Sequence, residues 1–274
     1  RAEPALSGLR PRMDAARPAD WKNYEDFAAG IATNRLPCTD AWVGRTLTLR
    51  LGDERLELRP QAAHSTAWKD DRGAGVDWYE AIELGPDLHF VDLTFASRLT
   101  IALTVVFNTR TRRALGIRTR VRDPGEAPGE PRPAQEFLPG IVGDDPSAAT
   151  GSVPAPTRDL IGLRTHQVYS PQHTYEHTYL NSQRYAWQCL VGVQRGQGDV
   201  DLASYYKFDE DQYVFTFREF LIPVASVFFF DFGRMRSTGK FLGITGSGEV
   251  ANNPAGAFMR KVSMTFYPPD AQPV

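Results

Sequence analysis

Cysteine, net charge and long apolar runs are all scarce in this chain of 274 residues. The two cysteines, Cys38 and Cys189, are too few for a disulfide framework and lack the spacing of a metal motif, so we expect a reduced, cytoplasmic protein. With 31 Lys and Arg against 33 Asp and Glu, no bulk charge attracts nucleic acid or an anionic membrane. The best apolar run, 222–230, is far shorter than the roughly 20 residues of a membrane-spanning helix. We therefore expect neither a nucleic-acid partner nor a membrane.

Helical periodicity is also rare, and one short helix near the start is the exception. Asp20 is the expected N-cap, because its side chain can accept a hydrogen bond from the free backbone amides of the first turn. Tyr24, Ala28 and Ile31 follow at steps of four and three residues, which is typical of one helix face. We therefore expect residues 1–40 to form an arm that contains this helix.

Proline and glycine crowd into residues 123–157, where eight prolines and five glycines occur. Such a density opposes regular structure, and the long alternating apolar runs seen elsewhere disappear there. We expect a linker or a long surface excursion over this segment. It divides the rest of the chain into two domains, 41–122 and 158–268.

The two domains resemble each other in sequence. Short strand-like runs separated by polar turns recur in the same order, which favours a duplicated, all-β fold of antiparallel sheets that curl and close into barrels. A repeat of about 110 residues is too long for a solenoid unit. The matching runs are 78–82, 88–93, 103–108 and 112–117 in the first half, and 205–208, 212–217, 227–231 and 239–244 in the second.

One strand-like run, 172–181, carries an unusual set of polar rings. Side chains alternate between the two faces of a strand, so His173, Tyr175, His177 and Tyr179 share one face. Glu176 falls on the opposite face, and only a β-bulge would bring it to the same side as His177. The two interpretations of the ring-bearing face are an exposed sheet surface and the wall of a closed cavity.

Neighbouring runs favour the cavity. On one later strand Tyr213, Phe215 and Phe217 share a face with Glu219, and an aromatic face that ends in a carboxylate is not expected to lie in water. Tyr185 and Trp187 share a face of the strand that follows 172–181. We therefore expect these faces to enclose an aromatic cavity whose ionisable groups are His173, His177 and Glu219. Burial would raise the pKa of such a carboxyl group, and a nearby imidazole could pair with it.

Three segments resemble the MoaF family: 21–37, 169–190, which includes Tyr169, and 234–243, which includes Arg234. The resemblance covers nearly the whole chain. It implies two related lipocalin-like barrels of the calycin group, built around apolar or mixed cavities. It also implies, as one alternative, an accessory role in molybdenum cofactor metabolism.

The amino-acid sequence contains no recognisable metal-binding or cofactor-binding motif. On a strand, His173 and His177 are about 13 Å apart along the backbone, too far to share one zinc ion unless His166 or His64 contributes from another strand. The chain has no Gly-x-Ser-x-Gly elbow, phosphate loop or dinucleotide fingerprint. We therefore expect no metal and no cofactor.

The leading functional hypothesis is a cofactor-independent lyase, isomerase or cyclase that acts on a small apolar or aromatic metabolite in the second barrel. His177 would be the principal acid and base, oriented by Glu176 or Glu219, with His173 as a hydrogen-bond donor. If the ligand carried a phosphate or carboxylate, Arg234 would bind that group at the mouth of the barrel. The alternatives are a non-catalytic lipocalin-like carrier and the accessory role named above.

The sequence gives no indication of an oligomeric state. The remaining predicted ligand-binding residues are Tyr169, Tyr175, Tyr179, Tyr185, Trp187, Tyr213, Phe215 and Phe217.

Overall fold

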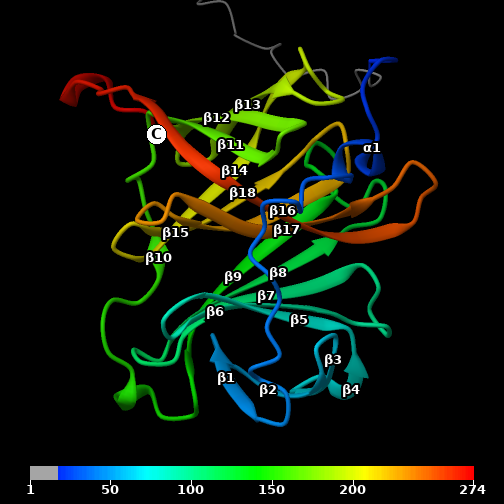
Figure 1. Cartoon of the computed structure of the whole chain (residues 1–274), viewed down its shortest axis with the longest axis vertical. Helices are drawn as coiled ribbons and strands as arrows, with labels where there is room; N and C mark the ends of the chain where they lie inside the picture. The colour runs from blue at the N-terminus through cyan, green and yellow to red at the C-terminus, as the bar shows by residue number, and fades with distance from the viewer. Residues whose placement is uncertain (1–17) are drawn as a thin grey trace, which may run out of the picture.

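The computed structural model describes residues 18–274, and this part of the chain is nearly all β (Figure 1). Its eighteen strands form two nine-stranded sheets in which every strand pair with a determined register is antiparallel. The expected fold class is confirmed. None of the helices in the described residues is long and apolar enough to cross a membrane.

The first sheet follows the chain from strand to strand. Its order is β4-β3-β2-β1-β9-β8-β7-β6-β5, so that β9 returns to pair with β1. Only Trp78 separates β4 from β5, and these two strands pair with β3 and β6 respectively. The strands are β1 (Leu47–Leu51), β2 (Glu54–Ala62), β3 (Ser65–Asp70), β4 (Gly73–Asp77), β5 (Tyr79–Gly85), β6 (Leu88–Thr94), β7 (Ile101–Asn108), β8 (Arg113–Val121) and β9 (Pro133–Val142).

The second sheet closes on itself. Its order is β10-β14-β13-β12-β11-β18-β17-β16-β15, and a further pairing of β14 with β15 completes an eight-stranded barrel from β11 to β18. Closure removes the free edges that an open sheet would expose. The strands are β10 (Ala155–Pro156), β11 (Leu163–Ser170), β12 (His173–Asn181), β13 (Arg184–Val191), β14 (Gly198–Asp209), β15 (Gln212–Arg218), β16 (Val224–Asp231), β17 (Arg236–Ile244) and β18 (Val250–Met264).

The long strand β14 explains how the two halves correspond. Its first part, 198–202, pairs with β13, and its second part, from Leu202 onward, pairs with β15. In the first half, two separate strands take these places on either side of Trp78: β4 pairs with β3, and β5 pairs with β6. The four strand-like runs matched in the sequence fall on β5 to β8 and on β14 to β17.

The interpretation of 123–157 as a linker is wrong for its central part. Residues 133–142 form β9, which pairs with β8 along its whole length. Proline misled the prediction because it is tolerated where no ladder hydrogen bond is lost. Pro133 begins the strand, and β1 pairs only with residues 140–142, so that Pro139 lies just before that ladder.

The arm before β1 belongs structurally to the second barrel. Helix α1 (Tyr24–Ala28) has Asn23 rather than Asp20 at its N-cap, and the Asp26 carboxylate accepts a hydrogen bond from the Asn23 amide at 2.8 Å. Five residues are too few for a helix that is stable alone. Tyr24 and Phe27 are buried in the core of the second barrel, and the Tyr24 hydroxyl donates to the Phe241 carbonyl oxygen at 2.8 Å.

The two barrels pack together through their outer faces, one above the other in Figure 1. Leu88, Phe90 and Ile117 of the first barrel share an apolar cluster with Val227 and Phe229 of the second. This cluster is buried on both sides. The halves therefore form one body rather than two independent domains.

A buried ion pair joins the halves beside this cluster. Lys240 Nζ lies 2.8 Å from Asp92 Oδ1, and the two side chains are 1% and 0% exposed. Asp92 also accepts hydrogen bonds from Thr104 at 2.7 Å and from Asn252 at 2.6 Å. Since Asp92 is on β6 while Lys240 and Asn252 are on β17 and β18, this cluster holds the barrels in register.

Candidate functional site

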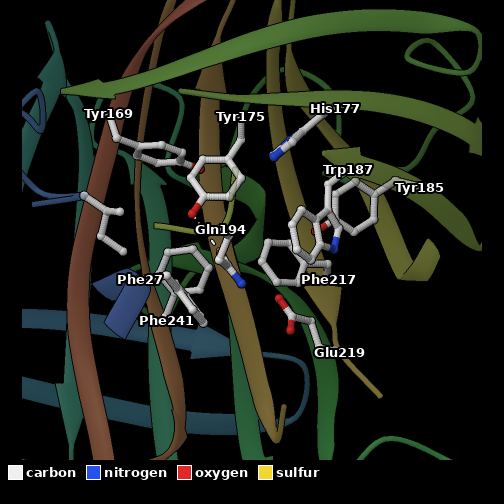
Figure 2. A pocket seen from close by; sticks show the side chains of 11 residues that line it. Phe27, Tyr169, Tyr175, His177, Tyr185, Trp187, Gln194, Phe217, Glu219 and Phe241 are labelled. Atoms are coloured by element: carbon white, nitrogen blue, oxygen red, sulfur yellow. Dashed lines mark hydrogen bonds between the residues drawn. The ribbon is translucent and has the colours of Figure 1, made fainter. Parts of the chain in front are cut away.

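The interior of the second barrel contains a small aromatic cavity (Figure 2). Its walls come from β11, β12, β13, β15 and β17, from the turn after β13, and from the N-terminal arm. The free volume is about 30 Å³, room for about two water molecules. The lining residues are Phe27, Ile31, Tyr169, Tyr175, His177, Tyr185, Trp187, Gln194, Phe217, Glu219 and Phe241.

The predicted alternation along 173–180 is confirmed. Tyr175, His177 and Tyr179 are buried at 8%, 3% and 0% exposure, whereas the residues between them are more exposed. Tyr175 and His177 line the cavity. The Tyr179 hydroxyl lies 3.2 Å from the Thr165 hydroxyl, and its ring belongs to the surrounding core.

His177 is surrounded by rings and has an unsatisfied nitrogen. The rings of Tyr179, Tyr185 and Phe215 lie 5.2–6.2 Å from its own ring, and its buried Nδ1 has no hydrogen-bond partner in the part of the chain that the structure describes. Burial alone lowers the pKa of His177 to about 3. The imidazole is therefore neutral near pH 7. A buried ring nitrogen without a partner costs free energy, so this side chain is poorly explained by packing alone.

Glu219 brings a carboxyl group into the same cavity just after β15. It is 7% exposed. Burial first, and then the charges of Asp201 and Asp199, raise its pKa well above the usual range. The raised pKa favours the protonated, uncharged carboxyl, a form that can donate a hydrogen bond.

His177 and Glu219 do not form the pair that the sequence suggested. Among the ion pairs of residues 18–274, none joins them. In Figure 2 they lie at opposite ends of the cavity, with aromatic rings between them. A neutral imidazole and a protonated carboxyl would attract each other only at hydrogen-bond distance, and each remains buried in an apolar wall at a cost in stability.

Gln194 and the arm were missed by the sequence analysis. The Tyr175 hydroxyl donates to Gln194 Oε1 at 2.8 Å (Figure 2), and Gln194 is only 3% exposed although it lies in a turn. Phe27 and Ile31 cover the cavity from the arm. A glutamine in a turn and a helix far away in the sequence carry no local signal of such a role.

Glu176 and His173 lie outside the cavity lining. The Glu176 carboxylate accepts from Gln188 at 2.7 Å and lies 3.2 Å from the ring of His166, so it faces the outside of the barrel. The register shifts of β12 fall at its ends, and no bulge turns Glu176 inward. His173 is half-buried and bonds Ser170 at 3.0 Å, with its ring packed against Gly30 of the arm.

Three further predicted ligand-binding residues are also engaged elsewhere. Tyr213 donates to Asp159 at 3.1 Å, and Phe215 stacks on Phe230 within the core. Arg234 pairs with Asp231 at 2.8 Å and lines a separate groove of about 480 Å³ between the halves. The predicted residues that do line the cavity are Tyr169, Tyr175, His177, Tyr185, Trp187, Phe217 and Glu219.

Metal-ligating side chains do not gather around this cavity. Within residues 18–274, no group of three or more His, Cys, Asp and Glu side chains is arranged to hold a metal ion. The cavity lining likewise contains no Arg or Lys side chain. Its chemistry is therefore that of neutral hydrogen-bonding groups among aromatic rings.

The fold and the cavity define an all-β protein of two packed antiparallel barrels, of which the second encloses an aromatic pocket. Family models agree with this division: the MoaF N-terminal domain matches residues 19–123, and the MoaF C-terminal domain matches residues 154–265. The chain belongs to the MoaF family.

A relative with a similar length supports this assignment. Protein MoaF of Klebsiella aerogenes is 32% identical over 244 residues, which covers 86% of this chain and 90% of that protein. Among solved structures, a putative beta-lactamase from Burkholderia vietnamiensis aligns over 100% of its own chain and 39% of this one, at 15% identity and a TM-score of 0.34. A likeness so distant has no bearing on function.

The charge state of Glu219 gives a testable stability profile. Because its pKa is raised in the folded protein, the unfolded chain releases this proton first, and stability falls as the pH rises above the ordinary glutamate pKa of about 4.3. Glu219→Gln should therefore raise the free energy of unfolding at neutral pH and raise it more at alkaline pH. Urea denaturation across the pH range measures this, with Glu176→Gln on the outer face as the matched control. A Glu219→Gln profile parallel to that of the wild type would show that Glu219 is ionised when folded.

Proposed function

We propose that the second barrel binds a small, uncharged, apolar or aromatic metabolite and exchanges a proton with it, as a cofactor-independent lyase, isomerase or cyclase. One observation carries this proposal. Two titratable side chains, His177 and Glu219, are each more than nine-tenths buried and face one aromatic cavity, and neither has an ion-pair partner within residues 18–274. Keeping both groups there costs stability, and proton transfer is a use that requires them.

Glu219 rather than His177 is the proton donor in this proposal. The raised pKa of Glu219 favours the protonated carboxyl, whereas a pKa of about 3 leaves the His177 imidazole without a proton at neutral pH. Glu219 would give its proton to the ligand while His177 accepts a different proton from it. The charge of the ligand is then unchanged, while the protein holds a Glu219 carboxylate and a His177 imidazolium. When the cavity opens to solvent, His177 releases one proton to water and Glu219 takes one up, which restores both groups.

Ligand entry requires the cavity to enlarge. Pockets for small metabolites measure about 300–1,000 Å³, and the free volume here is about 30 Å³. Phe27 and Ile31 are the lining residues that do not belong to the barrel or its turns. Displacement of the arm would open the cavity without breaking the sheet.

A non-catalytic carrier is the second candidate. The observation that favours it is the neutral state of both titratable groups, which suits simple binding of an uncharged molecule as well as it suits proton transfer. Extraction of the purified protein followed by mass spectrometry separates the two. A single unchanged apolar compound supports carriage. Conversion of a candidate metabolite, lost in His177→Ala, supports catalysis.

An accessory role in molybdenum cofactor metabolism would use a different surface. The pterin of that cofactor carries phosphate, and the groove between the halves offers two basic side chains, Arg234 and Arg236. Arg234 is already paired with Asp231, which weakens the case for an anion there. Titration with a pterin phosphate tests this role, and an absence of binding would reject it.

A further inference from the structure

Asp201 lies inside the second barrel next to Trp187, although its side chain is not part of the cavity lining. Its side chain is 1% exposed, and its Oδ2 accepts a hydrogen bond from Trp187 Nε1 at 2.9 Å. Its Oδ1 is 3.4 Å from the backbone amide of Phe220. The Trp187 ring is part of the cavity lining, so Asp201 holds one of the walls in place.

The strand register brings Asp201 close to Glu219. The ladder between β14 and β15 ends at the pair Leu202–Arg218, and Glu219 is the first residue after β15, so that extending the register by one step sets Asp201 across from Glu219. Residues directly opposite in an antiparallel pair have Cβ atoms about 4.5–5.5 Å apart. The amide of Phe220, next to Glu219, reaches the Asp201 carboxylate, which agrees with this placement. Both side chains point into the barrel and both are buried.

Two carboxyl groups at this spacing and out of water do not both ionise. The hydrogen bonds decide which one keeps the proton. Asp201 accepts from two N–H groups, which stabilise its carboxylate form, whereas no hydrogen bond to the Glu219 side chain is found in residues 18–274. The proton therefore resides on Glu219.

The other charged side chains near Asp201 and Glu219 do not cancel the negative charge of these two carboxyl groups. Asp199 on β14 adds negative charge and raises the pKa of both carboxyl groups, and Arg184 on β13 acts in the opposite sense on Asp201. Arg218 bonds Gln135 and Ser204 and so points away from the cavity. Burial remains the largest cause and raises the pKa of Asp201 to about 7.

We infer that Asp201 and Glu219 share one proton, that Asp201 is the positioning residue that keeps it on Glu219, and that the cavity accordingly takes an uncharged ligand with a carbonyl oxygen. The protonated Glu219 donates a hydrogen bond to that oxygen, while the Asp201 carboxylate repels an anion. This inference rests on the proposed function, because it names the ligand class of the same site.

Infrared spectroscopy of the ligand-free protein tests the pair without any substrate. At mildly alkaline pH the wild type should show the C=O stretch of a protonated carboxyl, and this band should vanish in Glu219→Gln and persist in Glu176→Gln. In Asp201→Asn the band should titrate away about one pH unit lower or more, because the neighbouring negative charge is gone. A wild type without the band, or an unchanged midpoint in Asp201→Asn, would overturn the inference. If Asp201→Asn does not fold, the comparison of Glu219→Gln with the wild type still shows whether the proton is on Glu219.

Calorimetric titration with two probes tests the ligand class. Benzaldehyde, an uncharged carbonyl compound, should bind at least about tenfold more tightly than benzoate, and the preference should shrink in Glu219→Gln. Equal binding of the two probes would overturn the assigned class. If the infrared band behaves as expected but neither probe nor any other small molecule binds, the carboxyl pair stands and the proposed function fails.

Discussion

Replacing Lys240 by methionine is expected to lower the free energy of unfolding by about 3–5 kcal/mol. Asp92 would then remain buried at 0% exposure without its cation, held only by the hydroxyl of Thr104 and the amide of Asn252. Methionine keeps the length and most of the volume of lysine, so the loss reports the charge rather than a cavity. Chemical denaturation followed by tryptophan fluorescence measures it.

The matched control is Lys207→Met. Lys207 pairs with Asp159 at the same distance of 2.8 Å, but the two side chains are 39% and 42% exposed. Water screens that pair, so its removal should cost only a small fraction of the loss at Lys240. Similar losses in the two variants would show that the interface between the barrels does not depend on the buried pair.

Replacing His177 by phenylalanine is expected to make the protein more stable and less active. The variant removes a buried Nδ1 that has no hydrogen-bond partner among the described residues, which should raise the free energy of unfolding by about 1–3 kcal/mol at neutral pH. Phenylalanine fits a neighbourhood that is already built of rings. Turnover of a converted ligand should fall by about 10²–10⁴-fold, the usual contribution of a proton-transfer group.

The gain in stability should grow in acid. The folded pKa of His177 is about 3, whereas that of unfolded histidine is about 6.5. As the pH falls below 6.5, His177 takes up a proton in the unfolded wild type but stays neutral in the folded protein. The wild type therefore loses stability through this residue, and His177→Phe does not. His166→Phe on the outer face is the control. A wild type that is equally stable down to pH 4 would contradict the burial of a neutral imidazole.

The sequence predicted the sheets well where alternation and turns were regular. The repeated runs matched β5 to β8 and β14 to β17, because buried strands of a closing sheet need apolar residues at fixed spacing. β9 was missed because Pro133 and Pro139 interrupt its apolar pattern, although both prolines pair with β8 and lie outside the short ladder with β1. The docking of α1 on the second barrel was missed because helix periodicity does not say which surface the helix covers.

The site was predicted in part for the same reasons. The inward faces around His177 and Glu219 follow from strand alternation, and the structure places both side chains in the cavity. The predicted contact between them fails, because alternation fixes a face but not a distance around the barrel. Asp201 has the same parity as the buried Ala203 and Tyr205, so strand alternation alone could have placed it inside.

The most direct measurement of the central claim is solvent deuterium exchange into a bound ligand. The protein is incubated in heavy water with an uncharged carbonyl compound that it binds, and the deuterium content of the recovered compound is measured by mass spectrometry. Wild-type protein should introduce deuterium at carbon, and both Glu219→Gln and His177→Phe should abolish this exchange while Glu176→Gln retains it. A ligand that binds in the cavity and returns unlabelled, or labelling that survives loss of Glu219, would contradict proton transfer in the second barrel.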